Sequence, residues 1–427
     1  MYKISVLDSG VKIVTYTDSR VSSEAVGVWI GAGGRYESTP ENGVSHFLEH
    51  LVFKGTKNRT YRQIKESIEG FGGILNGFTS DELTCFLAKV LSGQVATAVD
   101  VLMDLTFNSL IKTSDIQKER LVVYEEIKMY SDLPRHLAYD GLMQLLWPDH
   151  PLGRNIAGTV ETLKEMTRKD ILNYKETHYS PKNILIAACG NVAHDVIVKN
   201  AEKFITKNRL NKACCEKPVY QLSQAFKNES KTSFIIKNIE QTHCCLGVRA
   251  PDRKSSLRHA LTLLNIILGA NMSSRLFNEV RERKGLAYDI GTGIKRLSDD
   301  GAFIVHAGVV NEKVKETLTV IFKELKKIVR TLADKDEFTR AKLYYIGQLT
   351  MGIEDTSEHM SYIGETLLCE GNVKKIKEVI KEIEKVKVED IRKVAEMIFK
   401  RENLTLSIVG PLQKGQDEQL KQLMQTF

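Results

Sequence analysis

The sequence predicts an α+β protein of two homologous domains, each an antiparallel sheet flanked by helices. Three observations predict this fold class. Short strand-like runs alternate with longer runs of helical periodicity along the whole chain. The 427 residues exceed the usual size of one domain. The order of strands and helices in the first half also recurs in the second, which indicates duplication of a unit of roughly 200 residues.

The strands predicted in the first half share β-branched or aromatic residues and end at turn residues. They lie at residues 3–7, 11–16, 25–31, 74–79, 84–91 and 184–189. The helices predicted there share apolar residues at helical spacing. They lie at residues 43–55, 60–70, 95–108, 115–130, 136–146 and 168–177. Thr60 and Gln63 have the spacing of a capping box at the start of the second helix.

The second half repeats this order after a polar, poorly periodic segment at 207–231, which predicts a linker. We therefore expect a first domain at 1–206 and a second domain at 232–427. The repeated strands and helices lie at residues 244–248, 257–267, 302–309, 313–330, 337–352 and 404–409. Gly269 of the second half aligns with Gly55 of the first half.

Composition narrows the class of protein. The net charge of +7 is spread along the chain and does not interleave with aromatic residues, so we expect no nucleic-acid partner. Seven cysteines without C-x-x-C spacing indicate reduced thiols. No apolar run is long enough to span a membrane. The start of the chain shows no signal peptide or transit segment, and with the lysine- and isoleucine-rich composition this favours a bacterial, cytoplasmic protein.

Two histidines mark the helix at 43–55. His46 and His50 are four residues apart, so both imidazoles project from one side and can bind one zinc ion. Glu49 lies between them, which gives the order His-x-x-Glu-His, an inverted zinc-peptidase motif. The carboxylate in such a motif takes a proton from a metal-activated water. The alternative is a surface helix with two solvated histidines.

The repeat argues against that alternative. An offset of 214 residues, from 55 to 269, places the three motif residues on Ala260, Leu263 and Leu264. The second copy keeps an apolar helix and lacks the three polar side chains. The fold therefore does not require the His-x-x-Glu-His pattern.

A hydrolytic zinc ion needs a third protein ligand and one open position. Glu126 is the best candidate, because apolar or aromatic residues surround it at helical spacing and a metal would compensate its charge. These neighbours are Val122, Val123, Met129 and Tyr130. Glu119 lies seven residues earlier, at nearly the same angle on the helix. The alternative is a solvent-exposed carboxylate that binds no metal, and it is favoured only for Glu125.

The chain resembles the pitrilysin/insulinase zinc peptidases, most closely the half-length branch of mitochondrial processing peptidase subunits and their bacterial relatives. The resemblance covers nearly the whole chain and rests on four stretches in register. These stretches are 46–56, 76–79, 119–126 and 274–288. It implies that His46, His50 and Glu126 bind one Zn²⁺ per chain, that Glu49 is the general base, and that Glu119 steadies the site.

The resemblance also implies how substrate is held. Asn76 and Phe78 would lie at a strand edge where an extended peptide adds as a further strand. Arg281 and Tyr288 would come from the second domain to hold the substrate carbonyl and the developing oxyanion. Without the family resemblance, the stretch 274–288 indicates only a basic amphipathic helix with a solvated face.

Two positions depart from the family pattern. Gly77 follows Asn76 where alanine is common. Processing peptidases associate two acidic residues with a substrate arginine, and the corresponding positions here are His136 and Asp140. Asp140 remains a candidate substrate-binding residue, and a strict arginine preference is in doubt.

These observations predict a zinc metalloendopeptidase that acts on peptides or unfolded protein extensions. Full-length relatives enclose peptides between two such halves, so we expect a homodimer. The chain carries both the zinc motif and the Arg/Tyr pair, which favours active sites completed by the partner copy. The alternative is a non-catalytic structural or partner subunit, like the core proteins of the respiratory bc1 complex. The intact set of zinc residues argues against it.

Overall fold

The computed structural model describes residues 2–210 and 231–427, which form two compact units. Within these residues, the first unit combines 2–127, 154–210 and 350–375. The second unit combines 128–153, 231–349 and 376–427. Most of the predicted linker, 211–230, lies outside the described residues. No helix in the described part of the chain is long and apolar enough to cross a membrane.

The first unit contains a six-stranded sheet in the order β1-β2-β6-β3-β5-β4. Its strands are β1 (Lys3–Val6), β2 (Lys12–Thr17), β3 (Ser23–Ile30), β4 (Ile74–Thr79), β5 (Thr84–Leu91) and β6 (Ile184–Gly190). All neighbouring strands are antiparallel except β2 and β6, which are parallel. The predicted antiparallel sheet flanked by helices is confirmed, except that this one pair is parallel. The long connection between β2 and β6, which contains β3, β4, β5 and seven helices, makes parallel pairing possible.

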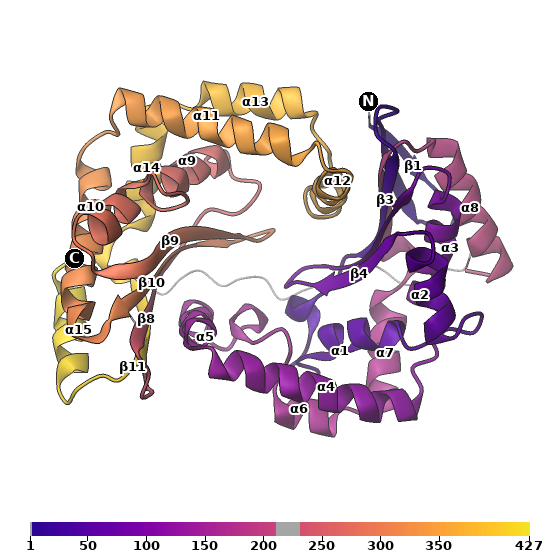
Figure 1. The fold of residues 1–427 in the computed structure, drawn as a ribbon, viewed down its shortest axis with the longest axis horizontal. Helices are drawn as coiled ribbons and strands as arrows, with labels where there is room; N and C mark the ends of the chain where they lie inside the picture. Colours follow the sequence, from indigo (N-terminus) through magenta and orange to yellow (C-terminus); the bar gives the residue numbers. More distant parts are fainter. Residues whose placement is uncertain (1, 211–230) are drawn as a thin grey trace. The chain divides into compact units, whose positions relative to one another are not determined.

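The second unit contains a five-stranded sheet in the order β7-β11-β8-β10-β9. Its strands are β7 (Lys231–Ile236), β8 (Gln241–Arg249), β9 (Ala287–Arg296), β10 (Gly301–Val310) and β11 (Thr405–Gly410). Here β7 and β11 are the parallel pair. Without β1, the first sheet has the same topology as the second, so the predicted duplication is confirmed (Figure 1).

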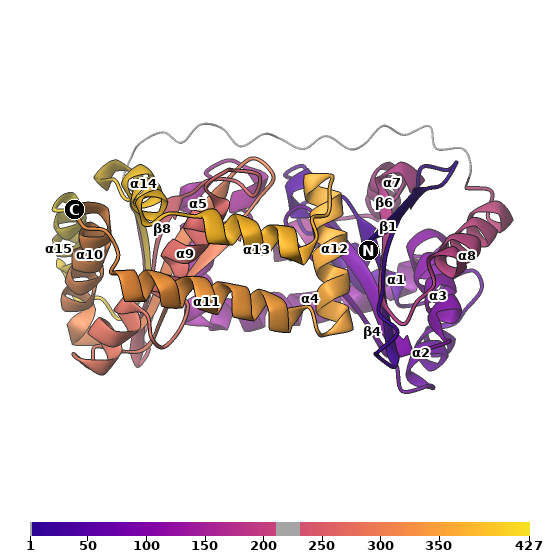
Figure 2. The ribbon, with the colours of Figure 1, turned by 90° about the horizontal axis from the view of Figure 1, so that it is seen from above.

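The helices follow the same repeated order (Figures 1 and 2). Those of the first repeat are α1 (Val44–Val52), α2 (Tyr61–Glu69), α3 (Val95–Asn108), α4 (Thr113–Asp132), α5 (Pro134–Leu146), α6 (Val160–Glu165), α7 (Arg168–His178) and α8 (His194–Lys207). Those of the second repeat are α9 (Arg258–Leu268), α10 (Val314–Arg330), α11 (Lys335–Gly352), α12 (Thr356–Glu370), α13 (Ile376–Lys385), α14 (Val388–Ile398) and α15 (Gln416–Gln425). The predicted capping box of α2 is present. Helix α1 ends at Val52, before the predicted stop at Gly55.

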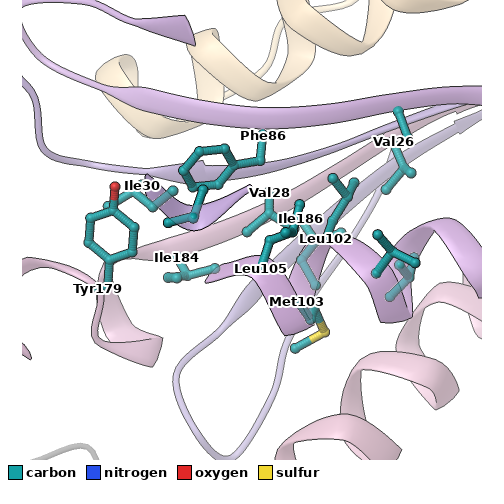
Figure 3. Close-up of a cluster of buried hydrophobic side chains, with 14 of the residues drawn as sticks. Val26, Val28, Ile30, Phe86, Leu102, Met103, Leu105, Tyr179, Ile184 and Ile186 are labelled. Carbon is teal, nitrogen blue, oxygen red and sulfur yellow. The ribbon is translucent and has the colours of Figure 1, made fainter. Parts of the chain in front are cut away.

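Strand β3 is buried on both faces, which explains its unbroken apolar sequence. Val26, Val28 and Ile30 point to one face, where they pack against α3 (Figure 3). Trp29 lies on the opposite face in a cluster with Met360 of α12. The first sheet is therefore the middle layer of three, with α3 on one side and α12 on the other.

The two repeats exchange one helix. Helix α5 of the first repeat packs on β7, β8 and β11 of the second sheet, and α12 of the second repeat packs on β2, β3 and β6 of the first sheet. Glycine permits both approaches, because a Cβ atom on Gly141 would collide with Ser407 and one on Gly364 would collide with Trp29. The compact units therefore differ from the contiguous domains predicted at 1–206 and 232–427.

A buried carboxylate fixes the loop that follows α1. Asp104 of α3 has no exposed surface and accepts side-chain hydrogen bonds from Thr56 at 2.6 Å, Asn58 at 2.6 Å, Arg59 at 2.8 Å and Asn108 at 2.9 Å. Burial raises the pKa of Asp104, but the four hydrogen bonds outweigh burial and the net pKa is lowered. The loop is thereby tied to α3.

We expect Asp104→Asn to lower the free energy of unfolding by about 2–4 kcal/mol, because it leaves buried donors without their charged acceptor. Asp100→Asn is the matched control: Asp100 pairs with the same Arg59, but its side chain is 48% exposed. The control should cost less than about 1 kcal/mol. Urea unfolding followed by circular dichroism measures both losses. Equal losses would contradict the role given to Asp104.

Candidate metal centre

Helix α1 has a buried apolar face and a polar face. Five apolar side chains are no more than 1% exposed and join the main core of the first unit. They are Val44, Phe47, Leu48, Leu51 and Val52. The other four positions of this nine-residue helix are Ser45, which is also buried, and His46, Glu49 and His50. The helix is amphipathic, and core packing fixes the direction in which the polar side chains project.

The start of α1 is held by a buried carboxylate. Gly43, at the N-cap, has φ +96°, a left-handed conformation that favours glycine. Glu37 accepts hydrogen bonds from the backbone N–H groups of Gly43 at 2.8 Å and Ser45 at 2.9 Å, which supplies the cap and complements the helix dipole. Burial raises the pKa of Glu37. The Ser45 hydroxyl also lies 2.8 Å from the hydroxyl of Tyr174 on α7.

The structure brings His46, His50 and Glu126 together. Glu126 Oε2 lies 3.6 Å from His46 Nε2 and 3.5 Å from His50 Nε2. One ligand atom from each residue lies within 4.8 Å of the others, and this is the only such group of three in residues 2–210 and 231–427. The separations exceed ordinary hydrogen-bond length. They are close to the ~3.3 Å between two ligand atoms of a tetrahedral zinc ion.

The chemistry of this group also fits zinc. Burial, and then the nearby His50, lower the pKa of His46 to about 4, so its imidazole is neutral at neutral pH and need not release a proton to bind a metal. The side chains of His46, His50 and Glu126 are 14%, 22% and 24% exposed, so the group is open to solvent. Two imidazoles and one carboxylate are a ligand set of catalytic zinc sites.

Glu49 lies beside these ligands and is held by β4. The Thr79 hydroxyl, at the end of β4, donates a 2.6 Å hydrogen bond to Glu49 Oε2. Burial has the largest effect on the pKa of Glu49 and raises it. The Thr79 hydrogen bond and the charge of His50 lower this pKa, and the charge of Glu126 raises it. The net pKa is raised. A carboxylate with a raised pKa is a better proton acceptor near neutral pH.

Glu119 lies near His50. Its Oε2 lies 3.5 Å from His50 Nδ1, on the side of the ring opposite the nitrogen that faces Glu126. Its Oε1 forms a 2.7 Å ion pair with Lys54 Nζ. A carboxylate at the second nitrogen of a ligating histidine orients the ring. The carboxylate of Glu119 is itself positioned by Lys54.

The prediction that Glu126 is more buried than Glu125 is confirmed, because Glu126 is half-buried and Glu125 is exposed. The predicted apolar surroundings of Glu126 are only partly present. Among the apolar neighbours of Glu126, Val123 is buried, but Val122 and Met129 are 50% and 52% exposed. The contact with the two histidines, and not an apolar stripe, accounts for the partial burial of Glu126.

The predicted peptide-binding residues Asn76 and Phe78 lie on β4, which is an edge strand of the first sheet and packs against α1. Asn76 is exposed, and its side-chain oxygen accepts a 2.8 Å hydrogen bond from the N–H of Gly77. Phe78 is 37% exposed and stacks edge-to-face on Trp29 at 5.7 Å. The strand edge therefore combines an exposed amide with an aromatic surface.

The other predicted substrate-binding residues belong to the second unit. The Arg281 guanidinium carbon lies 4.9 Å from the ring centroid of Tyr288 and 4.8 Å from that of Phe277, so the structure pairs Arg281 with Tyr288. Arg281 lies on a π-helical turn, and Tyr288, near the start of β9, is 74% exposed. Asp140 and His136 both lie on α5, where the His136 ring is 4.9 Å from that of Tyr130.

Three residues that support the centre were not predicted: Glu37, Lys54 and Thr79. Lys54 and Thr79 lie inside 46–56 and 76–79, two of the stretches on which the family resemblance rests, so that resemblance could have pointed to them. Glu37 lies in a loop without any pattern. Only the folded structure shows that its carboxylate reaches the start of α1.

Comparison with known proteins agrees with this architecture. Residues 12–160 match the family described as insulinase (peptidase family M16), and residues 165–345 match the family described as peptidase M16 inactive domain. A Bacillus subtilis protein named uncharacterized zinc protease YmxG is 36% identical over 413 residues, which cover 96% of this chain and 98% of that protein.

Two solved structures share the fold. A protease from Helicobacter pylori matches with a TM-score of 0.91 and 23% identity, over 96% of this chain and 99% of that chain. A chain of complex III2 from Candida albicans matches with a TM-score of 0.84 and 19% identity, over 99% of each chain. Both family matches and the coverage of the Bacillus relative lead to one conclusion: the chain belongs to peptidase family M16, the insulinase family.

Proposed function

We propose that this chain is a zinc metalloendopeptidase that cleaves peptides or unfolded protein extensions. One observation carries the proposal. His46, His50 and Glu126 bring ligand atoms within 4.8 Å of one another, and Glu49 projects beside them from α1, the helix that carries both histidines. A relative named zinc protease, 36% identical over nearly the full chain, supports it. Zinc bound by these residues would supply a Lewis acid that polarises a carbonyl and activates water.

Glu49 would act as the general base. Its carboxylate would take a proton from the attacking water and pass it to the leaving amine as the peptide bond breaks. The Thr79 hydroxyl holds Oε2, so Thr79 would orient Glu49 and leave the other carboxylate oxygen for the water. Glu119 would orient His50 in the same way, because it approaches the Nδ1 atom of that ring.

The substrate would bind as an extended strand. Within the part of the chain that the structure describes, strand β4 has one sheet neighbour, β5, so its second edge can form backbone hydrogen bonds with a peptide. Asn76 and Phe78 would contact that peptide. In the second unit, Arg281 and Tyr288 would hold the substrate carbonyl and the developing oxyanion, and Asp140 would contact a substrate side chain.

We further propose a homodimer whose two active sites are each completed by the partner copy. The support is that one chain carries both the zinc residues and the pair Arg281 and Tyr288. Sedimentation of the active protein tests the proposal, and an active monomer would remove it.

The ligand assignment predicts that Glu126→Gln lowers zinc content well below one ion per chain, because the amide replaces the only charged ligand. Glu125→Gln is the matched control, since Glu125 is exposed on the same helix and should leave zinc content unchanged. Elemental analysis after dialysis against a weak chelator measures both. Glu119→Gln should weaken zinc binding by about 10- to 100-fold, the usual effect of a residue that orients a ligand. Equal zinc content in all three variants would contradict the assignment.

The general-base assignment predicts that Glu49→Gln keeps zinc and loses about 10²- to 10⁴-fold in kcat, because the amide cannot accept the proton. Cleavage of a fluorogenic peptide, with zinc content measured on the same sample, tests this. Thr79→Val should lower kcat by less than Glu49→Gln, because it removes only the orienting hydrogen bond. Activity of Glu49→Gln close to that of the wild type would refute the role of Glu49.

A further inference from the structure

The first unit contains a polar cavity that none of the proposed zinc ligands lines. It measures about 380 Å³ and lies where the loop after α1, the end of α3 and helix α7 meet. Lys57 comes from the loop, Phe107 and Ser109 come from the end of α3, and Arg168 and Lys175 come from α7. Three of these five residues carry a positive charge.

Lys175 is a buried cation whose hydrogen-bond acceptors are both neutral. It is 9% exposed, and its Nζ donates hydrogen bonds to Ser109 Oγ at 2.6 Å and to the carbonyl oxygen of Phe107 at 3.3 Å. No carboxylate of the described chain forms an ion pair with it. Burial, and then the charge of Lys57, lower the pKa of Lys175 to about 8. The charge of Glu176 raises the pKa of Lys175 but does not outweigh burial. A buried ammonium group that forms no ion pair is costly.

Two exposed cations add to this charge. Arg168 donates from Nε to the carbonyl of Ile111 at 2.7 Å and from Nη2 to that of Leu110 at 3.2 Å, which leaves further guanidinium N–H donors unused. Lys57 and Arg168 form no ion pair with a carboxylate in residues 2–210 or 231–427. Glu176 is the only acidic residue in the lining, so three cations and one carboxylate give the lining a net charge of +2.

We propose that this cavity binds a small oxyanion with at least two negative charges, either free phosphate or the phosphate group of a small metabolite. At the buried end, the third N–H of Lys175 and the hydroxyl hydrogen of Ser109 would donate to the anion. Ser109 accepts from Lys175, so its own hydrogen remains available to a ligand. At the exposed end, the positive charges of Lys57 and Arg168 would attract the same anion. The anion would thus offset the net positive charge that remains in the lining after Glu176 is counted, independently of the peptidase proposal.

Calorimetric titration of the full-length protein with inorganic phosphate at low ionic strength tests the site. We expect one phosphate per chain, with an affinity that Lys175→Met lowers by about tenfold or more, as for loss of a hydrogen bond to a charged group. Lys65→Met is the control: Lys65 is an exposed lysine of α2, outside the lining, and its loss should leave the affinity unchanged.

Lys175 also contacts the end of α3, so a second variant keeps the test independent of folding. Lys57→Gln changes only an exposed side chain and should weaken phosphate binding severalfold. Tighter binding of glycerol 3-phosphate than of phosphate would assign the site to a phosphorylated metabolite, and weaker or equal binding to the free oxyanion. The proposal is overturned if phosphate does not bind, or if its binding survives both variants. Lys175 would then be only a cap of α3.

Discussion

The amphipathic character of α1 is the constraint on which the candidate centre depends. Within nine residues this helix buries an apolar face in the core of the first unit and presents His46, Glu49 and His50 on the other side. Glu37 fixes where the helix begins, and the Asp104 network holds the loop that follows it. The histidines are therefore positioned by packing and hydrogen bonds that involve no metal. Residues of β4 and α4 then complete the centre, through Thr79 and Glu126.

Duplication explains how one chain can carry a centre in one repeat only. Helix α9 corresponds to α1, and its Ala260, Leu263 and Leu264 are buried where the first repeat has the polar residues of the motif. The second copy therefore keeps the buried helix without the polar residues of the motif. Loss of ligands in one copy leaves its sheet and its exposed Arg281 and Tyr288 available for another role.

Much of the fold and the pair His46 and His50 could be predicted from the sequence, because both depend on local spacing. Glu126 lies on another helix, so only the folded structure shows that it reaches the two histidines. The strands and helices of the first half follow apolar periodicity, and the pair His46 and His50 follows the pitch of one helix turn. The exchange of α5 and α12 could not be predicted, since no local pattern shows which sheet a helix will cover. Glu37 was missed for the same reason: its contact with α1 is made by a loop that has no periodicity. Parallel pairing of β2 with β6 likewise depends on the path of a long crossover.

The most direct test of the central claim is zinc content and peptide cleavage of the wild-type protein, measured before and after zinc is removed by a chelator. We expect about one zinc per chain, cleavage of unfolded peptides, loss of cleavage when the metal is removed, and recovery when zinc is added back. A protein that holds zinc and cleaves nothing in a broad peptide library would contradict it and favour a structural or partner subunit. A protein that binds no zinc would show that the group formed by His46, His50 and Glu126 is not a metal centre.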